Sequence, residues 1–290
     1  MIKLTASLLK RMRTRKNPLD LALSILVWLS AAITFVTLFY LVGYILVKGI
    51  PYLKPSLFAI RYTSENVSLF PALITTVFMV ALSLLIAVPL GMFTAIYLVE
   101  YAKRGNKLVQ LVRVTAETLS GIPSIVYGLF GALLFVSALG WGLSLLAGSF
   151  TLAIMILPLI MRTSEESLKS VPDTYREGSF SLGAGRLRTV FRVVLPAAVP
   201  GILTGIILAI GRIVGETAAL IYTAGAVAKI PENLLASGRT LAVHMYALSG
   251  EGMNTGQAYA TAVILLAVVI GINALSAAMA KKIARGNNSV

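Results

Sequence analysis

The segment from residue 201 to residue 223 places two charged side chains, Arg212 and Glu216, inside an apolar sequence. Its roughly 23 residues can cross a bilayer as a helix, and a charge near the centre of such a helix costs about 2.5–3.5 kcal/mol. At 100° per residue, the charged pair shares one side of the helix with small residues, and most branched aliphatic residues fall on the side that can face lipid. The small residues are Gly201, Gly205, Gly215 and Ala219. We therefore expect the charged pair to point into a helix bundle or a water-filled path.

Two interpretations of this pair are compatible with each other. In the first, Arg212 and Glu216 are four residues apart and neutralise each other. In the second, Arg212 lines the path of an anion and Glu216 holds it in place. A planar guanidinium matches a tetrahedral oxyanion and offsets part of the cost of moving that anion into a low dielectric. Thr217 and Thr223 add neutral donors to the expected site, although Thr217 falls on the other face of the helix.

The composition is that of an integral membrane protein with an all-α fold. Hydrophobic residues make up 58% of the chain, charged residues 12%, and the mean hydropathy is +0.88. There are no cysteines, which excludes disulfides and thiolate metal sites. The lone histidine, His244, has no acidic residue at ligand spacing, so we expect a packing or surface histidine and no metal site. The net charge of +14 is distributed along the loops, which argues against nucleic acid as a partner.

Apolar runs predict six transmembrane helices. The run from residue 121 to residue 161 is too long for one crossing, and Gly140-Trp141-Gly142 is the expected turn between two spans. Nineteen lysines and arginines fall in the N-terminal arm, the loops 100–117 and 162–196 and the tail, and five fall in the opposite loops. This asymmetry places both termini in the cytoplasm. The expected spans are 21–47, 70–98, two spans within 121–161, 201–223 and 257–280.

The polar loop 162–196 predicts two short helices separated by glycines. Thr174 and Glu177 form the pattern of a capping box, and Gly183 and Gly185 interrupt the helix that would follow. Aromatic residues beside basic ones suit a knob that enters the groove of a partner protein. They equally suit an interfacial helix that lies on anionic lipid.

The same loop resembles the EAA loop of ABC-importer permeases. That family pattern is E-A-A-x3-G-x9-I-x-L-P, and here Glu177, Gly178, Ser179 and Gly183 are followed by Val193-Val194-Leu195-Pro196. Gly178 and Ser179 replace the two alanines and Val193 replaces the isoleucine. The resemblance implies a type I ABC-importer permease fold with a cytoplasmic coupling helix between spans four and five. It also implies that Glu177, Gly178, Ser179, Gly183, Leu195 and Pro196 belong to the contact with an ATP-hydrolysing subunit.

Three further segments, 120–128, 165–172 and 211–218, resemble the PstA-type permease subunits of phosphate importers. The resemblance covers about residues 70–282. It implies a heterodimer with a second homologous permease subunit, two ATP-binding subunits and an external phosphate-binding protein in a prokaryotic inner membrane. It also implies that Arg212 and Glu216 matter for phosphate passage. The expected division is a basic cytoplasmic arm (1–20), a first helix with its external loop (21–69), a permease core (70–282) and a tail (283–290).

The sequence contains no nucleotide-binding G-x-x-x-x-G-K-[ST] loop and no plausible catalytic set. We therefore expect a non-enzymatic transport subunit without a cofactor, and ATP must bind another chain. Rival hypotheses are a permease for another oxyanion, such as sulfate or molybdate, and a secondary transporter that works alone. Two segments stay open. Residues 120–128 either form a broken helix end that lines the transport path or simply place a proline in the first turn of span three. Residues 224–256 either form a surface for the external binding protein or fold as a re-entrant hairpin.

Overall fold

A computed structural model describes residues 18–103, 105–252 and 254–287, and every regular element in these ranges is helical. Most of the predicted arm (1–20) and the end of the predicted tail (283–290) lie outside the described residues. The α-helices are α2 (Pro18–Gly49), α3 (Phe70–Ile96), α4 (Lys107–Ser120), α5 (Ser124–Gly131), α6 (Leu145–Lys169), α7 (Asp173–Ser181), α8 (Arg186–Thr189), α9 (Leu195–Val214), α10 (Ala218–Thr223), α11 (Leu241–Glu251) and α12 (Thr255–Asn287).

Shorter helical turns connect or extend these helices. Two are 3-10 turns, η1 (Ile50–Tyr52) and η2 (Pro55–Phe58). Three are π-helical turns at helix ends, namely η3 (Tyr97–Tyr101) after α3, η4 (Ala132–Ala138) after α5 and η5 (Val190–Val194) before α9. The turn η5 joins α8 to α9, so one helical segment of 29 residues runs from Arg186 to Val214.

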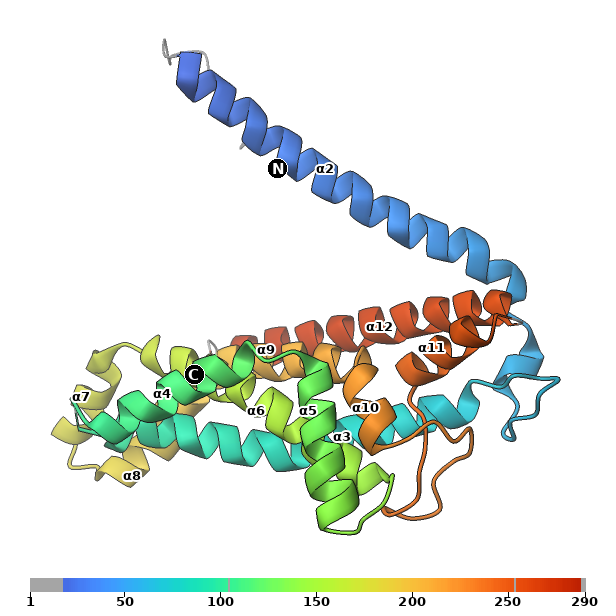
Figure 1. The fold of residues 1–290 in the computed structure, drawn as a ribbon. Coiled ribbons are helices and arrows are strands. Elements are labelled where there is room, and N and C mark those ends of the chain that lie inside the picture. The colour runs from blue at the N-terminus through green and yellow to red at the C-terminus, as the bar shows by residue number, and fades with distance from the viewer. Residues whose placement is uncertain (1–17, 104, 253, 288–290) are drawn as a thin grey trace.

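Within the described residues, five single helical segments are long and apolar enough to cross a membrane, and the count is six if a bent pair of helices forms one span. The bent pair is α4 with α5 and η4, which meet at 103° (Figure 1). The helix α5 and η4 lie within the predicted third span, and α4, which the sequence did not predict, occupies most of the predicted loop 100–117. Asn106 starts α4 by accepting a hydrogen bond from the Leu108 N–H at 2.9 Å. The predicted turn after η4 is confirmed, since Gly140 and Gly142 have φ of 68° and 64°.

The core lies between α3, α6 and α9, which run side by side in Figure 1. Gly201 and Gly205 face α6 so closely that a Cβ at either would overlap Ser167 or Thr163, which confirms the close approach predicted for the small face. The prediction that the aliphatic face meets lipid is wrong in part. Ile202, for example, is buried in a cluster that includes residues of α3, because α3 covers that side of α9.

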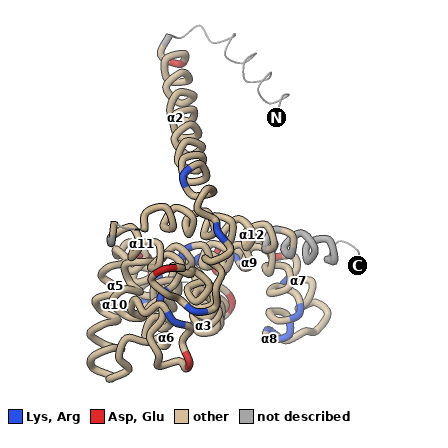
Figure 2. The backbone as a smooth tube through the Cα atoms, turned by 90° about the vertical axis from the view of Figure 1, so that its right-hand side faces the viewer, with Lys and Arg blue, Asp and Glu red and all other residues tan. Residues whose placement is uncertain are grey.

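The helix α2 stands away from the rest of the bundle (Figure 1). Its most apolar stretch has no buried residue, and its charges lie near its two ends, at Asp20 and Lys48 (Figure 2). Only its C-terminal end is enclosed, where Gly49 is buried against Tyr259 and Val263 of α12. Its apolar side chains therefore face either lipid or another protein.

The two long polar segments are more ordered than the sequence predicts. The helix α6 continues through Lys169, so the first residues of the predicted loop 162–196 belong to span four. The predicted capping box is wrong, because α7 starts at Asp173 after Pro172 and no side chain caps it. Segment 224–256 is not a hairpin: it is a coil followed by the single helix α11, which buries Leu241 and Leu248.

Candidate functional site

Span five breaks soon after Arg212, so the predicted continuous helix over 201–223 is wrong. The helix α9 ends at Val214, Gly215 follows as its C-cap, and α10 begins at Ala218. The Glu216 carboxylate oxygen Oε1 accepts a hydrogen bond from the backbone N–H of Ala219 at 3.1 Å, and Glu216 is 9% exposed. A carboxylate is stabilised at a helix N-terminus because it satisfies free N–H groups there. No ion pair joins Arg212 and Glu216 in the described part of the chain, so Glu216 caps α10 instead of neutralising Arg212.

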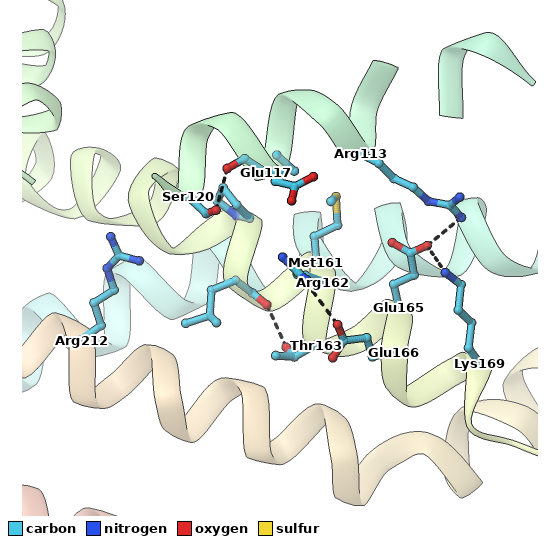
Figure 3. A pocket seen from close by; sticks show the side chains of 13 residues that line it. Arg113, Glu117, Ser120, Met161, Arg162, Thr163, Glu165, Glu166, Lys169 and Arg212 are labelled. Atoms are coloured by element: carbon cyan, nitrogen blue, oxygen red, sulfur yellow. Dashed lines mark hydrogen bonds and ion pairs between the residues drawn. The ribbon is translucent and has the colours of Figure 1, made fainter. Parts of the chain in front are cut away.

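A cavity of about 590 Å³ lies between α4, α6 and α9 (Figure 3). Its lining is rich in charge, with four basic and three acidic residues. The basic residues are Arg113 on α4, Arg162 and Lys169 on α6, and Arg212 on α9; the acidic residues are Glu117, Glu165 and Glu166. The formal charge of the lining is therefore positive by one unit.

Most of these charges are already paired. Glu165 is buried, and its Oε1 lies 2.7 Å from the Arg113 guanidinium and 2.7 Å from the Lys169 ammonium. The more exposed Glu166 accepts a hydrogen bond from Arg162 at 3.2 Å. In Figure 3, Arg212 stands apart from these pairs at the other end of the cavity. Over residues 18–103, 105–252 and 254–287, no ion pair involves Arg212, so its charge is available to an anion that enters the cavity.

Thr217 does not share this cavity. It lines a second one of about 600 Å³, which α5, α10, α11, α12 and Ile45 of α2 enclose and which is mainly apolar with a few hydroxyl groups. The break in span five thus separates the two predicted site residues: Arg212, before the break, lines the charged cavity, and Thr217, after it, lines the apolar one. Thr223 is buried and donates its hydroxyl to the Ala219 carbonyl, so it faces neither cavity.

The segment 120–128 forms the bend between α4 and α5. Ser120 ends α4 and lines the charged cavity, and Pro123 precedes the first turn of α5. Both interpretations of this segment are therefore partly correct: a proline begins the helix, and the helix end also lies on the cavity. Gly128 packs against the backbone of Ala219, where a Cβ would come within 2.8 Å. Because of this contact, the bend and the break in span five lie against each other.

The predicted coupling residues lie at the end of the bundle marked α7 and α8 in Figure 1. Glu177, Gly178 and Ser179 are on α7, and the Ser179 hydroxyl lies 2.9 Å from the hydroxyl of Thr189 on α8. Gly183, with φ of 81°, makes the turn after α7. Leu195 and Pro196 begin α9. The surface of α7 and the following turn exposes Tyr175, Phe180 and Leu182.

His244 on α11 is a packing histidine. It is fully buried and meets the ring of Tyr62 edge-on at a centroid distance of 6.2 Å. The Arg239 guanidinium lies over the face of the same Tyr62 ring, 4.6 Å from its centroid. Burial, together with the nearby Arg239 charge, lowers the pKa of His244 to about 3, so the ring is neutral at physiological pH.

Residues 87–285 match the family model described as the binding-protein-dependent transport system inner membrane component. The chain belongs to this family. Among curated relatives, it is 35% identical over 240 residues to the probable ABC transporter permease protein YqgI of Bacillus subtilis, covering 78% of this chain and 81% of that protein. It is 38% identical over 221 residues to the phosphate transport system permease protein PstA of Pasteurella multocida, covering 73% and 75%. The predicted resemblance to PstA-type permeases is confirmed.

Solved importer structures share the fold of this permease. A bacterial alginate ABC transporter, in complex with an alginate-bound periplasmic protein, aligns over 88% of this chain and 95% of its own with a TM-score of 0.63 and 17% identity. A methionine ABC transporter in an inward-facing conformation aligns over 74% and 94% with a TM-score of 0.58 and 21% identity. The all-α importer-permease fold is confirmed, and the chain is a transport subunit of a multi-pass membrane family.

Sequence reasoning missed most residues that line the charged cavity of the permease. Arg113 and Glu117 were assigned to a basic loop, and Arg162, Glu165 and Lys169 to a polar one. A signal for them exists: in α6, both Arg162–Glu166 and Glu165–Lys169 have the four-residue spacing of helical ion pairs. The residues of α4 come next to α6 only through the bend, which the sequence pattern did not predict.

Proposed function

We propose that this permease forms part of the path for inorganic phosphate in an ATP-driven importer. The observation that carries the proposal is the position of Arg212. It lines a charged cavity beside a break in a membrane span, and no carboxylate pairs with it in the described ranges. The identity of 38% to a phosphate permease supports phosphate as the oxyanion.

The charge balance of the cavity fits an anion that must bind and then leave. At about 4 Å and an effective dielectric constant of about 20, one guanidinium attracts a single negative charge by roughly 4 kcal/mol before desolvation is counted. The other three basic residues contact Glu165 and Glu166, and Glu117 also lines the cavity, so the phosphate meets a lining with a formal charge of +1 instead of +4. This limits retention of the anion, which a transport path requires.

The proposal extends to the partners of this permease, and the exposed surface of α7 supports the contact with an ATP-binding subunit. The exposed apolar side chains of α7 suit the groove of an ATP-binding subunit, with Glu177, Gly178, Ser179 and Gly183 at or near the contact. A second, homologous permease subunit completes the path, two ATP-binding subunits hydrolyse ATP, and an external phosphate-binding protein delivers the anion. Both termini then lie in the cytoplasm, as the excess of positive charge on the loops of that side indicates.

The test is phosphate uptake by the complete complex in proteoliposomes. We expect Arg212→Gln to lower uptake at least tenfold while the ATP-binding subunits still co-purify, and Arg212→Lys to retain part of the activity because the charge remains. Excess sulfate or molybdate should compete weakly with labelled phosphate. Uptake of phosphate by Arg212→Gln at the wild-type rate would refute the role of Arg212, and stronger competition by sulfate or molybdate would refute phosphate as the substrate.

A further inference from the structure

The guanidinium of Arg176, on α7, uses all five of its N–H groups. Nε and Nη2 donate to the carboxylate of Glu100, at 3.2 Å and 2.7 Å from Oε1. The second Nη2 hydrogen is directed to the carbonyl of Leu168 at 3.0 Å. Nη1 donates to the carbonyl of Val171 at 2.8 Å and to the carboxylate of Asp173 at 3.1 Å. Nε also lies 3.4 Å from Oε2, so the guanidinium contacts both oxygens of the carboxylate, and such contact fixes the orientation of the two groups.

These contacts join α7 to two separate membrane spans. Glu100 lies in the π-helical turn η3 at the end of α3, 76 residues before Arg176. Leu168 and Val171 carry carbonyl groups at the end of α6, where a cation is favourable for the helix dipole. The side chains of Arg176 and Glu100 are only 14% and 8% exposed. By contrast, no residue of α7 is buried, so packing alone holds α7 weakly.

The connectivity of the chain explains why the contact with Glu100 matters. A displacement of α7 reaches α6 through the three residues between Lys169 and Asp173, and reaches α9 through the turn and α8. The helix α3 has no such covalent connection to α7, and it meets the ends of α6 and α9 through the apolar cluster that contains Ala95 and Ile96. The ion pair with Glu100 adds a direct polar connection from α7 to α3, and the more exposed Tyr101, whose ring lies 5.3 Å from the Arg186 guanidinium, adds a contact between η3 and α8.

We propose that the Arg176–Glu100 pair transmits movement of α7 to α3, so that spans two, four and five move together when nucleotide binds to the partner subunit. This inference rests on the proposed function, in which α7 docks on an ATP-binding subunit. Arg176 and Glu100 are positioning residues, because neither lines the cavity that contains Arg212. A lysine at position 176 keeps the charge but loses the fork, so it should transmit movement poorly.

The absence of cysteines from the chain permits a direct test by site-specific labelling. Two single-cysteine reporters, Phe93→Cys on α3 and Leu208→Cys on α9, replace side chains that are 54% exposed. Each is placed in the complete complex, and its rate of labelling by a maleimide is measured with and without a non-hydrolysable ATP analogue. The second reporter is the matched control, because α9 is covalently connected to α7.

In the otherwise wild-type complex, we expect the nucleotide to change both labelling rates at least threefold. With Arg176→Gln or Glu100→Gln, the response on α3 should disappear while the response on α9 and the rate of ATP hydrolysis remain, and phosphate uptake should fall at least tenfold. The double variant should behave like either single variant, because both remove the same contact.

Other outcomes overturn the inference. If both reporters still respond in Arg176→Gln, the pair does not transmit movement; if both responses and co-purification of the ATP-binding subunit are lost, the pair only holds the structure together. If neither reporter responds in the wild-type complex, α7 does not receive nucleotide-driven movement, and the inference falls with it. Failure of phosphate as the substrate is seen separately, since the reporters respond to nucleotide and not to phosphate.

Discussion

Replacing Glu216 distinguishes its role as a helix cap from a role as the counter-charge of Arg212. Its Oε1 accepts the Ala219 N–H at 3.1 Å in a buried setting, and the side chain of Thr217 provides no cap in its place. Loss of such a cap costs about 1 kcal/mol within a range of about 0.5–2 kcal/mol. Glu216→Ala should therefore destabilise α10 by about 1 kcal/mol. Glu216→Gln retains a carbonyl oxygen that can accept the same bond, and it should cost less than about 0.5 kcal/mol.

Hydrogen exchange measures this difference locally. A loss of 1 kcal/mol corresponds to roughly a fivefold increase in the population of the open state, and hence in the exchange rate of the α10 amides in the Glu216→Ala protein. The amides of α3 provide an internal control, because α3 does not depend on this cap. Exchange is measured by mass spectrometry on the purified complex in detergent.

Either of two results would refute this reasoning. If Glu216→Gln and Glu216→Ala accelerate exchange equally, the negative charge is what matters, and the cap does not explain the residue. If neither variant changes exchange over α10, the hydrogen bond to Ala219 contributes nothing to the break in span five. Equal phosphate uptake by wild type and Glu216→Gln would further show that Arg212 works without a counter-charge at position 216.

Three other predictions concern packing, ion pairs and pH. Gly205→Leu should lower thermal stability by about 3 kcal/mol, because its Cβ would overlap α6, whereas Gly211→Leu, with open space around its Cβ, should cost less than about 1 kcal/mol. Glu165→Gln should cost about 1–2 kcal/mol in the same thermal assay, since the carboxylate is buried but its partners are half-exposed, and Glu166→Gln should cost less than about 0.5 kcal/mol. Because the pKa of His244 is lowered to about 3, the unfolded chain binds a proton below pH 6.5 that the folded chain does not. Stability should therefore fall by about 1 kcal/mol from pH 6.5 to pH 5.5, and His244→Phe should flatten this dependence.

The number and order of the spans were predictable because each long apolar run can form one membrane crossing, as in α3, α6 and α12. The turn between Gly140 and Gly142 was also predictable, because both glycines adopt positive φ. The break after Gly215 was not. Apart from Glu216 and Thr217, the residues on both sides of it are apolar or small. The hydrogen bond that Glu216 accepts from the Ala219 N–H at the start of α10 is a local preference that periodicity does not detect.

The composition of the candidate site was predicted only at one residue. Arg212 was identified because a charge stands out in an apolar segment, whereas Arg113 and Glu165 lie in segments where charge is ordinary. Their meeting depends on the 103° bend between α4 and α5, which brings a predicted loop against α6. Long-range placement of this kind comes from packing of the whole bundle, and a linear pattern of residue types does not contain it.

The separation of α2 from the bundle has a consequence for how the chain can be assembled. Since the remaining helices enclose their core without it, α2 can insert into the bilayer as an independent unit during synthesis, before the segments that follow have been made. The family match begins only at residue 87, well beyond this helix. The packing around Arg212 therefore does not depend on α2, whose residues do not line the charged cavity.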